Sequence, residues 1–350
     1  MKPIFINKRK ISNKNSPYII AEISANHDGS INKAKKTIKA AKKIGADAVK
    51  IQSYTPDTMT LNCTKSDFLI NEGLWKGNSL YELYSKAYTP FEWHKELFEY
   101  ANKENITLFS SPFDETAVDL LESLNTPAYK IASFELVDLP LIGYVAKFKK
   151  PMIMSTGMAN EQEISEAIET AKINGCDEIV LLHCISSYPA PIEQANINTM
   201  LKLKKVFNVQ VGLSDHTLGN TASIVATSLG ASVIEKHFTV NRSDGGPDSS
   251  FSLEPKEMCF FIKSCRESFN SLGKKRILKM PAEEKSIIFR RSLYFVKEIK
   301  KGEKIKRESV RRIRPGYGLS PKYLDDVIGC KAKYNLSPGQ KVSWEYIEKN

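Results

Sequence analysis

The sequence lacks the features that mark several large classes of protein. No apolar run approaches the ~20 residues that a membrane-spanning helix needs. Residues 1–14 have no apolar centre of the kind that a signal peptide carries. The six cysteines show no paired spacing typical of a zinc site. These absences predict reduced thiols and a cytoplasmic protein without a membrane partner.

Nucleotide-binding and nucleic-acid-binding signals are missing as well. No strand–glycine-loop–helix fingerprint for a dinucleotide occurs, nor a glycine loop for nucleotide phosphates. The net charge is +11, from 51 basic and 40 acidic residues, but the basic residues are spread along the chain without interleaved aromatics. We therefore expect no nucleic-acid partner. A nucleic-acid-binding protein would instead show strongly salt-dependent retention on DNA.

Eight short apolar runs alternate with helical stretches between about residues 17 and 272. They lie at residues 18–22, 48–52, 107–111, 128–131, 151–155, 178–183, 211–216 and 233–237. This alternation and length are typical of an α/β protein built as a (β/α)8 TIM barrel. A doubly wound sheet is the structural alternative, and the missing dinucleotide fingerprint argues against it.

The composition changes after the eighth unit. Residues 274–285 turn polar and contain Pro281, which predicts a linker over 274–289. Residues 290–350 contain short alternating runs and turns, which predict a small β-rich domain. We therefore expect a barrel domain at 1–273, a linker at 274–289 and a small domain at 290–350. At about 60 residues the small domain is marginal for independent folding and is expected to dock on a partner surface.

Polar residues stand at the carboxyl ends of all eight predicted strands, where TIM barrels carry their chemistry. They are Glu22, Lys50, Gln52, Ser111, Lys130, Ser133, Ser155, His183, Ser214, His216, Glu235 and His237. One polar strand end is uninformative, because every strand must stop. Eight in register, with a common inward parity, predict a single polar cavity.

Two of these residues, His216 and His237, end consecutive parallel strands and should lie a few ångströms apart. Two imidazoles without thiolates suit Mn²⁺, Co²⁺, Fe²⁺ or Zn²⁺, with Asp215 or Glu235 as the acceptor that orients a ring. The alternative is a pair of packed or hydrogen-bonded histidines. The position at two strand ends favours the metal.

Lys50 and Lys130 would be costly inside a barrel mouth unless an anion binds there. Lysine suits phosphate or carboxylate, and the serine hydroxyls would complete the hydrogen bonds around it. Glu22 could act as general acid or base, or as a salt-bridge partner of Lys50. These interpretations are compatible, so we expect a site for an anionic small molecule.

Two further segments border the predicted mouth. Residues 245–252 follow the eighth strand, and Asp248 in this loop could bind hydroxyl groups. The segment from Tyr54 to about Tyr88 is too long for a simple connection, which predicts a lid or a subunit contact.

Several motifs resemble those of the sialic acid synthase family. They are AEISANHDGS at 21–30, STGM at 155–158, GLSDHT at 212–217 and EKHFT at 235–239. The segment RIRPG at 312–316 is similar to part of that family's C-terminal antifreeze-like (SAF) domain. The resemblance covers nearly the whole chain.

The resemblance implies condensation of phosphoenolpyruvate with an open-chain N-acetylated amino sugar, and it implies roles for individual residues. Glu22, His216 and His237 would be catalytic, and the two histidines would hold a divalent metal, typically Mn²⁺, with Co²⁺ or Mg²⁺ as alternatives. Phosphoenolpyruvate would be held by Lys50, Ser111, Lys130, Ser133, Ser155 and Ser214. The sugar would be held by Gln52, Tyr188, Glu235 and Asp248. A domain-swapped homodimer would bring Arg314 of one subunit to the other's site.

Within the family, the segments 133–142 and 243–255 look like those of pseudaminic acid synthases. Ser187 stands where sialic acid synthases tend to carry asparagine, which suits 2,4-diacetamido-2,4,6-trideoxy-L-altrose rather than N-acetylmannosamine. An apolar mouth around Phe134 and Phe251 would suit the methyl group of a 6-deoxy sugar.

Other functions stay open at this point. An N-acetylneuraminate or legionaminate synthase would use another N-acetylated sugar. A metal-dependent pyruvate aldolase would share the barrel and the histidines, but it would release no phosphate. A non-catalytic role in binding ice or a polymer is suggested only by the name of the tail domain.

Overall fold

The computed structural model describes residues 2–274 and 276–348. They divide into two compact units, the first ending at Gly273 and the second beginning at Lys274. The predicted domain limits at residues 1 and 350, and Lys275 of the predicted linker, lie outside the described residues. Among the described residues, no helix combines the length and the apolar character that crossing a bilayer requires.

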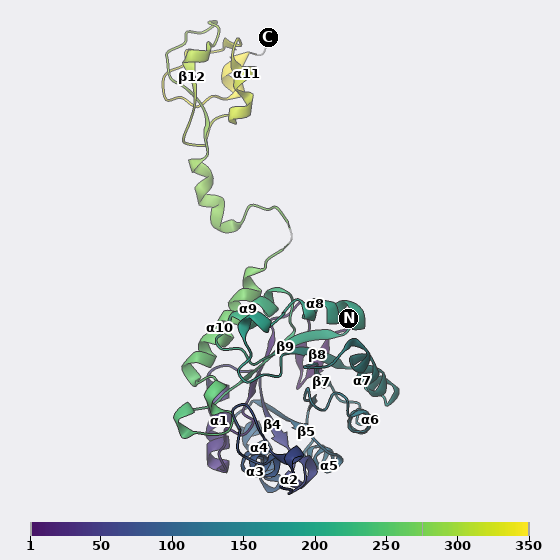
Figure 1. Cartoon of the computed structure of the whole chain (residues 1–350). Helices are drawn as coiled ribbons and strands as arrows, with labels where there is room; N and C mark the ends of the chain where they lie inside the picture. The colour runs from purple at the N-terminus through teal and green to yellow at the C-terminus, as the bar shows by residue number, and fades with distance from the viewer. Residues whose placement is uncertain (1, 275, 349–350) are drawn as a thin grey trace. The chain divides into compact units, whose positions relative to one another are not determined.

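The first unit is the predicted TIM barrel (Figure 1). Eight parallel strands follow one another around the barrel in chain order, and the last pairs with the first. They are β3 (Tyr18–Glu22), β4 (Ala48–Ser53), β5 (Thr107–Pro112), β6 (Tyr129–Ile131), β7 (Met152–Ser155), β8 (Ile179–Cys184), β9 (Gln210–Asp215) and β10 (Val233–His237). The predicted fold class is confirmed.

Helices cover the outside of the barrel and bury one apolar face each. They are α1 (Ile31–Lys43), α4 (Phe91–Lys103), α5 (Glu115–Ser123), α6 (Leu139–Ala146), α7 (Glu161–Ile173), α8 (Thr199–Phe207), α9 (Thr221–Ser228) and α10 (Pro255–Ser271). In α7, Asn160 and Glu163 form a capping box, and Ile164, Ala167, Ile168 and Ala171 are buried at helical spacing. The largest apolar core lies between these helices and the strands.

A short hairpin that the sequence did not predict closes the amino-terminal end of the barrel. Strands β1 (Ile4–Ile6) and β2 (Arg9–Ile11) pair antiparallel around Asn7 and Lys8, both with positive φ. Ile4, Ile6 and Ile11 join the residues that fill the lower barrel interior, among them Tyr18 and Phe109. The carboxyl ends of the strands are therefore left as the open end.

A long segment between β4 and α4 holds α2 (Pro56–Met59), η1 (Ser66–Phe68) and α3 (Leu80–Ala87). Three further one-turn 3-10 helices lie in loops of the barrel: η2 (Ile192–Gln194), η3 (Arg242–Asp244) and η4 (Ser249–Phe251). The last two belong to the loop that follows β10.

The second unit has its own small core, which includes Leu293, Phe295, Val310 and Ile347. It contains β11 (Ser292–Phe295), η6 (Arg307–Ser309), β12 (Val310–Ile313), η7 (Pro321–Tyr323), α11 (Leu324–Val327), β13 (Lys331–Ala332), η8 (Trp344–Tyr346) and β14 (Ile347–Glu348). The predicted β-rich character is confirmed. The predicted linker contains the 3-10 helix η5 (Pro281–Phe289), and the domain limits themselves stay a prediction.

Candidate active site

A cavity of about 360 Å³ opens at the carboxyl ends of the barrel strands. Of the polar residues predicted to surround it, all but Ser111 and His183 line it: Glu22, Lys50, Gln52, Lys130, Ser133, Ser155, Tyr188, Ser214, His216, Glu235, His237 and Asp248. Ser111 lies directly beside it and accepts a hydrogen bond from Lys50 Nζ at 3.3 Å. The predicted convergence of the strand ends is present, and the role of each residue stays a prediction.

The register of the strands explains this convergence. Glu22 lies opposite Lys50 on β4 and opposite His237 on β10, and Glu235 lies opposite Ser214 on β9. Side chains alternate faces along a strand, so one inward-pointing residue fixes the parity of the others. Paired positions on adjacent strands therefore lie side by side on the inner face of the barrel.

Two lysines and two glutamates form a buried ion-pair network at the cavity floor. Lys50 Nζ lies 2.6 Å from Glu22 Oε2 and 3.4 Å from Glu235 Oε1, and Lys130 Nζ lies 3.7 Å from the same Glu235 oxygen. Lys130 also donates to Ser155 Oγ at 2.7 Å. Lys50 is only 3% exposed and Lys130 2%, so both charges point into the protein as predicted.

Burial and the neighbouring charges set different protonation behaviour within this network. Burial raises the pKa of Glu22 to about 7, because desolvation outweighs the attraction of Lys50. Glu235 is also desolvated, but Lys130 and Lys50 together hold its pKa below the usual value. Burial lowers the pKa of Lys130. Glu22 is thus the floor carboxyl suited to exchanging a proton near neutral pH.

The two predicted metal ligands stand side by side. The ring centroids of His216 and His237 are 5.4 Å apart. Nδ1 of His216 lies 3.0 Å from the carbonyl oxygen of Ile185, so this nitrogen carries the proton and Nε2 keeps its lone pair. Burial lowers the pKa of His237 well below its usual value, which keeps that imidazole neutral. Burial alone would lower the pKa of His216, but Cys184 and the carbonyl of Ile185 raise it, so this imidazole would give up a proton when a cation binds.

The immediate surroundings are also consistent with a cation bound by few protein ligands. Nδ1 of His237 is buried and has no hydrogen-bond partner among the described residues. No group of three or more His, Cys, Asp or Glu side chains within residues 2–274 and 276–348 is arranged as a metal site. Two histidines would therefore leave positions open for substrate or water.

Two predictions about neighbouring residues are wrong. Asp215 does not orient an imidazole, because its carboxylate faces the outside of the barrel, where it accepts from Thr217 and Ser223 and pairs with Lys236 Nζ at 3.1 Å. His183 also faces outward, with Nε2 2.7 Å from the carbonyl oxygen of Ala195. The strand continues one residue further, and Cys184 lines the cavity instead.

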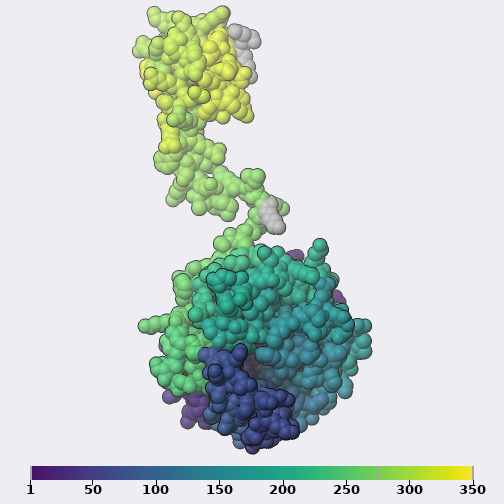
Figure 2. Space-filling view, viewed as in Figure 1, coloured from purple at the N-terminus to yellow at the C-terminus, as the bar shows by residue number. Residues whose placement is uncertain are grey.

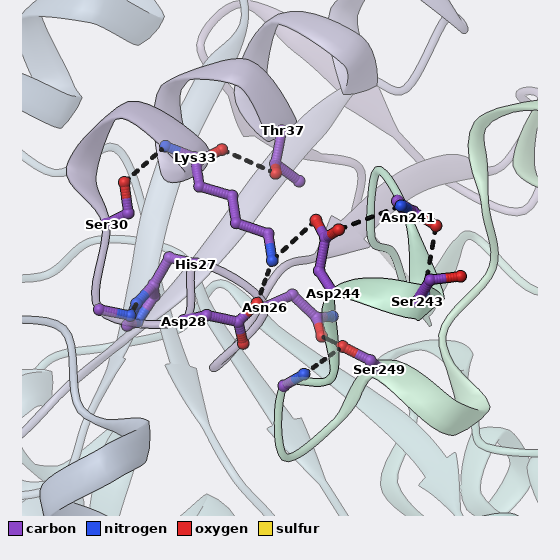
Figure 3. A network of polar contacts seen from close by, with 12 residues as sticks. Asn26, His27, Asp28, Ser30, Lys33, Thr37, Asn241, Ser243, Asp244 and Ser249 are labelled. Carbon is purple, nitrogen blue, oxygen red and sulfur yellow. Dashed lines mark hydrogen bonds and ion pairs between the residues drawn. The ribbon is translucent and has the colours of Figure 1, made fainter.

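The loop after β10 is fastened to the loop between β3 and α1 by a network of polar contacts (Figure 3). Asn26 accepts from Ser249 Oγ at 3.1 Å, and Lys33 pairs with Asp28 and, at 2.9 Å, with Asp244. Lys33 lies in the first turn of α1, which Ser30 caps. The loop after β10 also carries Asp248 into the cavity, where the Asp248 carboxylate accepts a hydrogen bond from Ser24.

The long segment 54–88 forms the remaining wall. The sequence did not predict which residues of this segment line the site. Trp75, Leu83 and Tyr84 from this segment line the cavity, and Figure 2 shows the surface hollowed beside it, where the segment is drawn in dark blue. Only the length of the segment signalled a functional role. Phe134 lines the cavity as expected, but Phe251 is buried behind the rings of Tyr188 and His237, so its predicted place in the mouth is wrong.

Arg314 belongs to the second unit, where it directly follows β12 and is exposed. Its contribution to a barrel site stays a prediction.

Comparisons with known proteins show the family of the chain. The model of the NeuB family matches residues 37–277, and that of the SAF domain matches residues 290–348. The chain belongs to the NeuB family. The predicted sialic acid synthase resemblance is therefore confirmed, and the chain is a phosphoenolpyruvate-condensing nonulosonic acid synthase.

Relatives within the NeuB family differ in how similar they are. The chain is 46% identical to a pseudaminic acid synthase of Helicobacter pylori, over 95% of this chain and 98% of that one. It is 37% identical to an N,N'-diacetyllegionaminic acid synthase of Legionella pneumophila, over 95% of this chain and 94% of that one. The crystal structure of an N-acetylneuraminic acid synthetase from Leptospira borgpetersenii superposes with a TM-score of 0.73 at 29% identity, over 82% of this chain and 95% of that one.

Proposed function

We propose that this NeuB-family protein is a pseudaminic acid synthase. It would condense phosphoenolpyruvate with 2,4-diacetamido-2,4,6-trideoxy-L-altrose and water, and release pseudaminic acid and phosphate. The greater identity to the Helicobacter pylori pseudaminic acid synthase than to the legionaminic acid synthase, 46% against 37%, supports this branch.

One observation supports the chemistry above all others: three polar atoms at the cavity floor are buried and have no hydrogen-bond partner among residues 2–274 and 276–348. They are Glu22 Oε1, Glu235 Oε2 and His237 Nδ1. Buried polar atoms are rarely left unpaired, because each costs desolvation free energy without a compensating bond. Carboxylate oxygens accept hydrogen bonds, so these atoms are consistent with a floor that is completed by the hydroxyl donors of a sugar, by water or by a cation, while the two buried lysines suit an anion.

Phosphoenolpyruvate would occupy the lysine side of this floor. Lys50 and Lys130 would neutralise its phosphate and carboxylate. The remaining hydrogen bonds would come from the hydroxyls of four serines, Ser111, Ser133, Ser155 and Ser214. The sugar would contact Gln52, Tyr188, Glu235 and Asp248 with its aldehyde end near the imidazoles. Fixing both reactants in one cavity converts an encounter in solution into a reaction between neighbours.

His216 and His237 would hold a divalent cation, for which we propose Mn²⁺, with Co²⁺ or Mg²⁺ as alternatives. When bound, such a cation supplies Lewis-acid polarisation of a carbonyl oxygen. The neutral state of His237 and the fixed tautomer of His216 are what this role requires of the chain.

The reaction then forms one carbon–carbon bond and breaks one carbon–oxygen bond. Carbon 3 of phosphoenolpyruvate attacks the aldehyde carbon, whose oxygen takes a proton and becomes a hydroxyl. Water adds to carbon 2 and loses one proton. The new hydroxyl then gives its proton to the departing phosphate, as the bond from carbon 2 to the bridging oxygen breaks and the ketone forms. Glu22, with a pKa of about 7, is placed to donate the first proton as the acid and to accept the second as the carboxylate.

Two measurements test this proposal. Phosphate release is measured with phosphoenolpyruvate and, separately, the altrose, the corresponding legionaminate precursor and N-acetylmannosamine. The altrose should give the highest kcat/KM; a higher value for another sugar reassigns the branch. Turnover in ¹⁸O-labelled water should place the label in the sugar acid, whereas label in phosphate would contradict C–O cleavage.

We also propose a domain-swapped homodimer in which Arg314 of one subunit completes the partner's site. Its support is the exposure of Arg314 and the separate core of its unit. Arg314→Ala and Glu22→Gln chains should each be inactive alone. Mixed and refolded together, they should regain activity, because one site in a mixed dimer then holds both native residues. Absence of regain in a verified mixed dimer would show that Arg314 does not act across subunits.

A further inference from the structure

The apolar face of helix α3 points into the cavity rather than into a core. Leu80, Leu83, Tyr84 and Ala87 follow the spacing i, i+3, i+4, i+7, which places them on one face of the helix. All four line the cavity, and no residue of α3 is buried. An amphipathic helix normally buries such a face against the protein. This one keeps it half-exposed beside the site.

The surrounding segment holds this face in place. Trp75 Nε1 donates to the carbonyl oxygen of Pro247 at 3.1 Å, which links the segment to the loop that carries Asp248. The ring of Tyr84 packs edge-on against buried Tyr54 at 5.8 Å. Ser79 and Glu82 form a capping box that starts α3. The wall is therefore built before a ligand arrives, which limits the ordering cost of binding.

The cavity is chemically divided. Lysines, carboxylates and imidazoles occupy the strand ends, while Met59, Ile70 and the face of α3 form an apolar wall on the segment between β4 and α4. The ring of Trp75 lies 6.1 Å from that of Tyr188, and Tyr188 lies 4.4 Å from the imidazole of His216, all measured between centroids. An aromatic path thus leads from the proposed position of the aldehyde to the apolar wall.

We propose that the α3 face and Trp75 form a subsite for the C6 methyl group of the acceptor sugar, and that this subsite selects 6-deoxy sugars. The inference rests on the proposed function. The aldehyde carbon is C1 and must lie at the polar floor, so C6, at the other end of the open chain, extends away from the strand ends, along the path from His216 through Tyr188 to Trp75 and the apolar wall. There a methyl group leaves water for an apolar surface, which is favourable.

A hydroxyl group at C6 would lose water at this wall and meet mainly carbon. An apolar pocket discriminates by roughly 10- to 200-fold between groups that differ this little. The subsite therefore acts on kcat/KM for the sugar and not on the binding of phosphoenolpyruvate at the floor.

The test compares two acceptors that differ only at C6: 2,4-diacetamido-2,4,6-trideoxy-L-altrose and its 6-hydroxy counterpart. Phosphate release gives kcat/KM for each. The wild-type ratio, deoxy over hydroxy, should lie well above one. Leu83→Asn, which places an amide on the apolar face, should lower the ratio by about 10-fold or more and leave KM for phosphoenolpyruvate unchanged.

Ser85→Asn is the matched control, because it places the same amide on the exposed side of the same helix. It should keep the wild-type ratio, and Leu83→Met should largely restore it. An unchanged ratio in Leu83→Asn would overturn the subsite while leaving the proposed function intact. Failure of the wild type to release phosphate with either altrose would instead overturn the proposed function.

Discussion

The two sides of the cavity are built in opposite ways. The strand-end side consists of charged groups that are at most a few per cent exposed and are tied to each other, as Lys50 is to Glu22 and Glu235. The α3 side consists of half-exposed apolar groups on a segment outside the barrel, held by few polar contacts such as that of Trp75 with Pro247.

This difference assigns different tasks to the two sides. Chemistry needs groups fixed to within a fraction of an ångström, and parallel strands whose ends are locked by pairing provide that precision. Selection among similar sugars needs only a surface of suitable shape and polarity, and an inserted segment can change without disturbing the barrel. Substitutions on the strand side should therefore reduce the rate itself, while those on the α3 side should change preference.

The largest effect is expected from His237→Ala. Removal of one of two imidazole ligands should abolish detectable Mn²⁺ binding in an electron paramagnetic resonance titration and reduce turnover to background. His183→Gln is the matched control, since His183 lies near the carboxyl end of β8 but faces outward. It should keep the wild-type Mn²⁺ affinity. Equal affinity in His237→Ala and wild type would remove the ligand assignment.

The next effect concerns Glu22, whose burial raises its pKa to about 7. The profile of kcat/KM against pH reports the free enzyme, so it should show a limb with an apparent pKa near 7. Glu22→Gln cannot titrate, so it should lose this limb and about 10²- to 10⁴-fold in rate.

Glu135→Gln is the control for that profile. Burial raises the pKa of Glu135 to about 7 as well, and this carboxyl also lines the cavity. The limb should persist in Glu135→Gln. If the limb instead vanished with Glu135 and stayed in Glu22→Gln, the proton transfers would belong to Glu135.

Lys130→Met should have a smaller effect than Glu22→Gln, and it should act on the affinity for phosphoenolpyruvate and not on the proton transfers. Removing one partner of a buried charged hydrogen bond costs about 2–5 kcal/mol of binding, or roughly 30-fold to several thousand-fold. The loss should appear as weaker binding of phosphoenolpyruvate, measured by calorimetry. Lys172→Met on the exposed side of α7 serves as control. An unchanged affinity in Lys130→Met would place the anion elsewhere.

The same contrast explains how much could be predicted from the sequence. Strand parity places Glu22, Lys50, Lys130 and Glu235 correctly, because alternation along a strand is a strict geometric rule. The prediction for His183 is wrong because it treats this residue as the inward-facing end of β8. The strand extends to Cys184, and Leu182 and Cys184 pair with the inward-facing Ser155 and Ser214, so His183 between them faces outward. An error of one residue moves a side chain to the other face.

Structure that depends on distant contacts could not be predicted in this way. The hairpin β1–β2 has strands of three residues and an Asn-Lys turn, so its local signal is weak, and its burial comes from the barrel interior that it covers. The α3 face has an ordinary amphipathic pattern, which predicts a helix but not what the helix faces. The role of the α3 side therefore follows only from the three-dimensional structure, in which residues 75–87 lie beside the strand ends.

The smallest effect is expected from Trp75→Phe, which keeps the aromatic wall but removes the donor to Pro247 at 3.1 Å. A neutral hydrogen bond contributes about 0.5–1.5 kcal/mol, or roughly 2- to 12-fold. Because the bond anchors the segment to the loop of Asp248, KM for the sugar should rise within this range while kcat and KM for phosphoenolpyruvate stay constant. Trp75→Ala also removes the ring and should add a loss of preference for the 6-deoxy sugar. A fall in kcat in Trp75→Phe would show that the α3 side contributes to the chemical step, and the division between the two sides would then not hold.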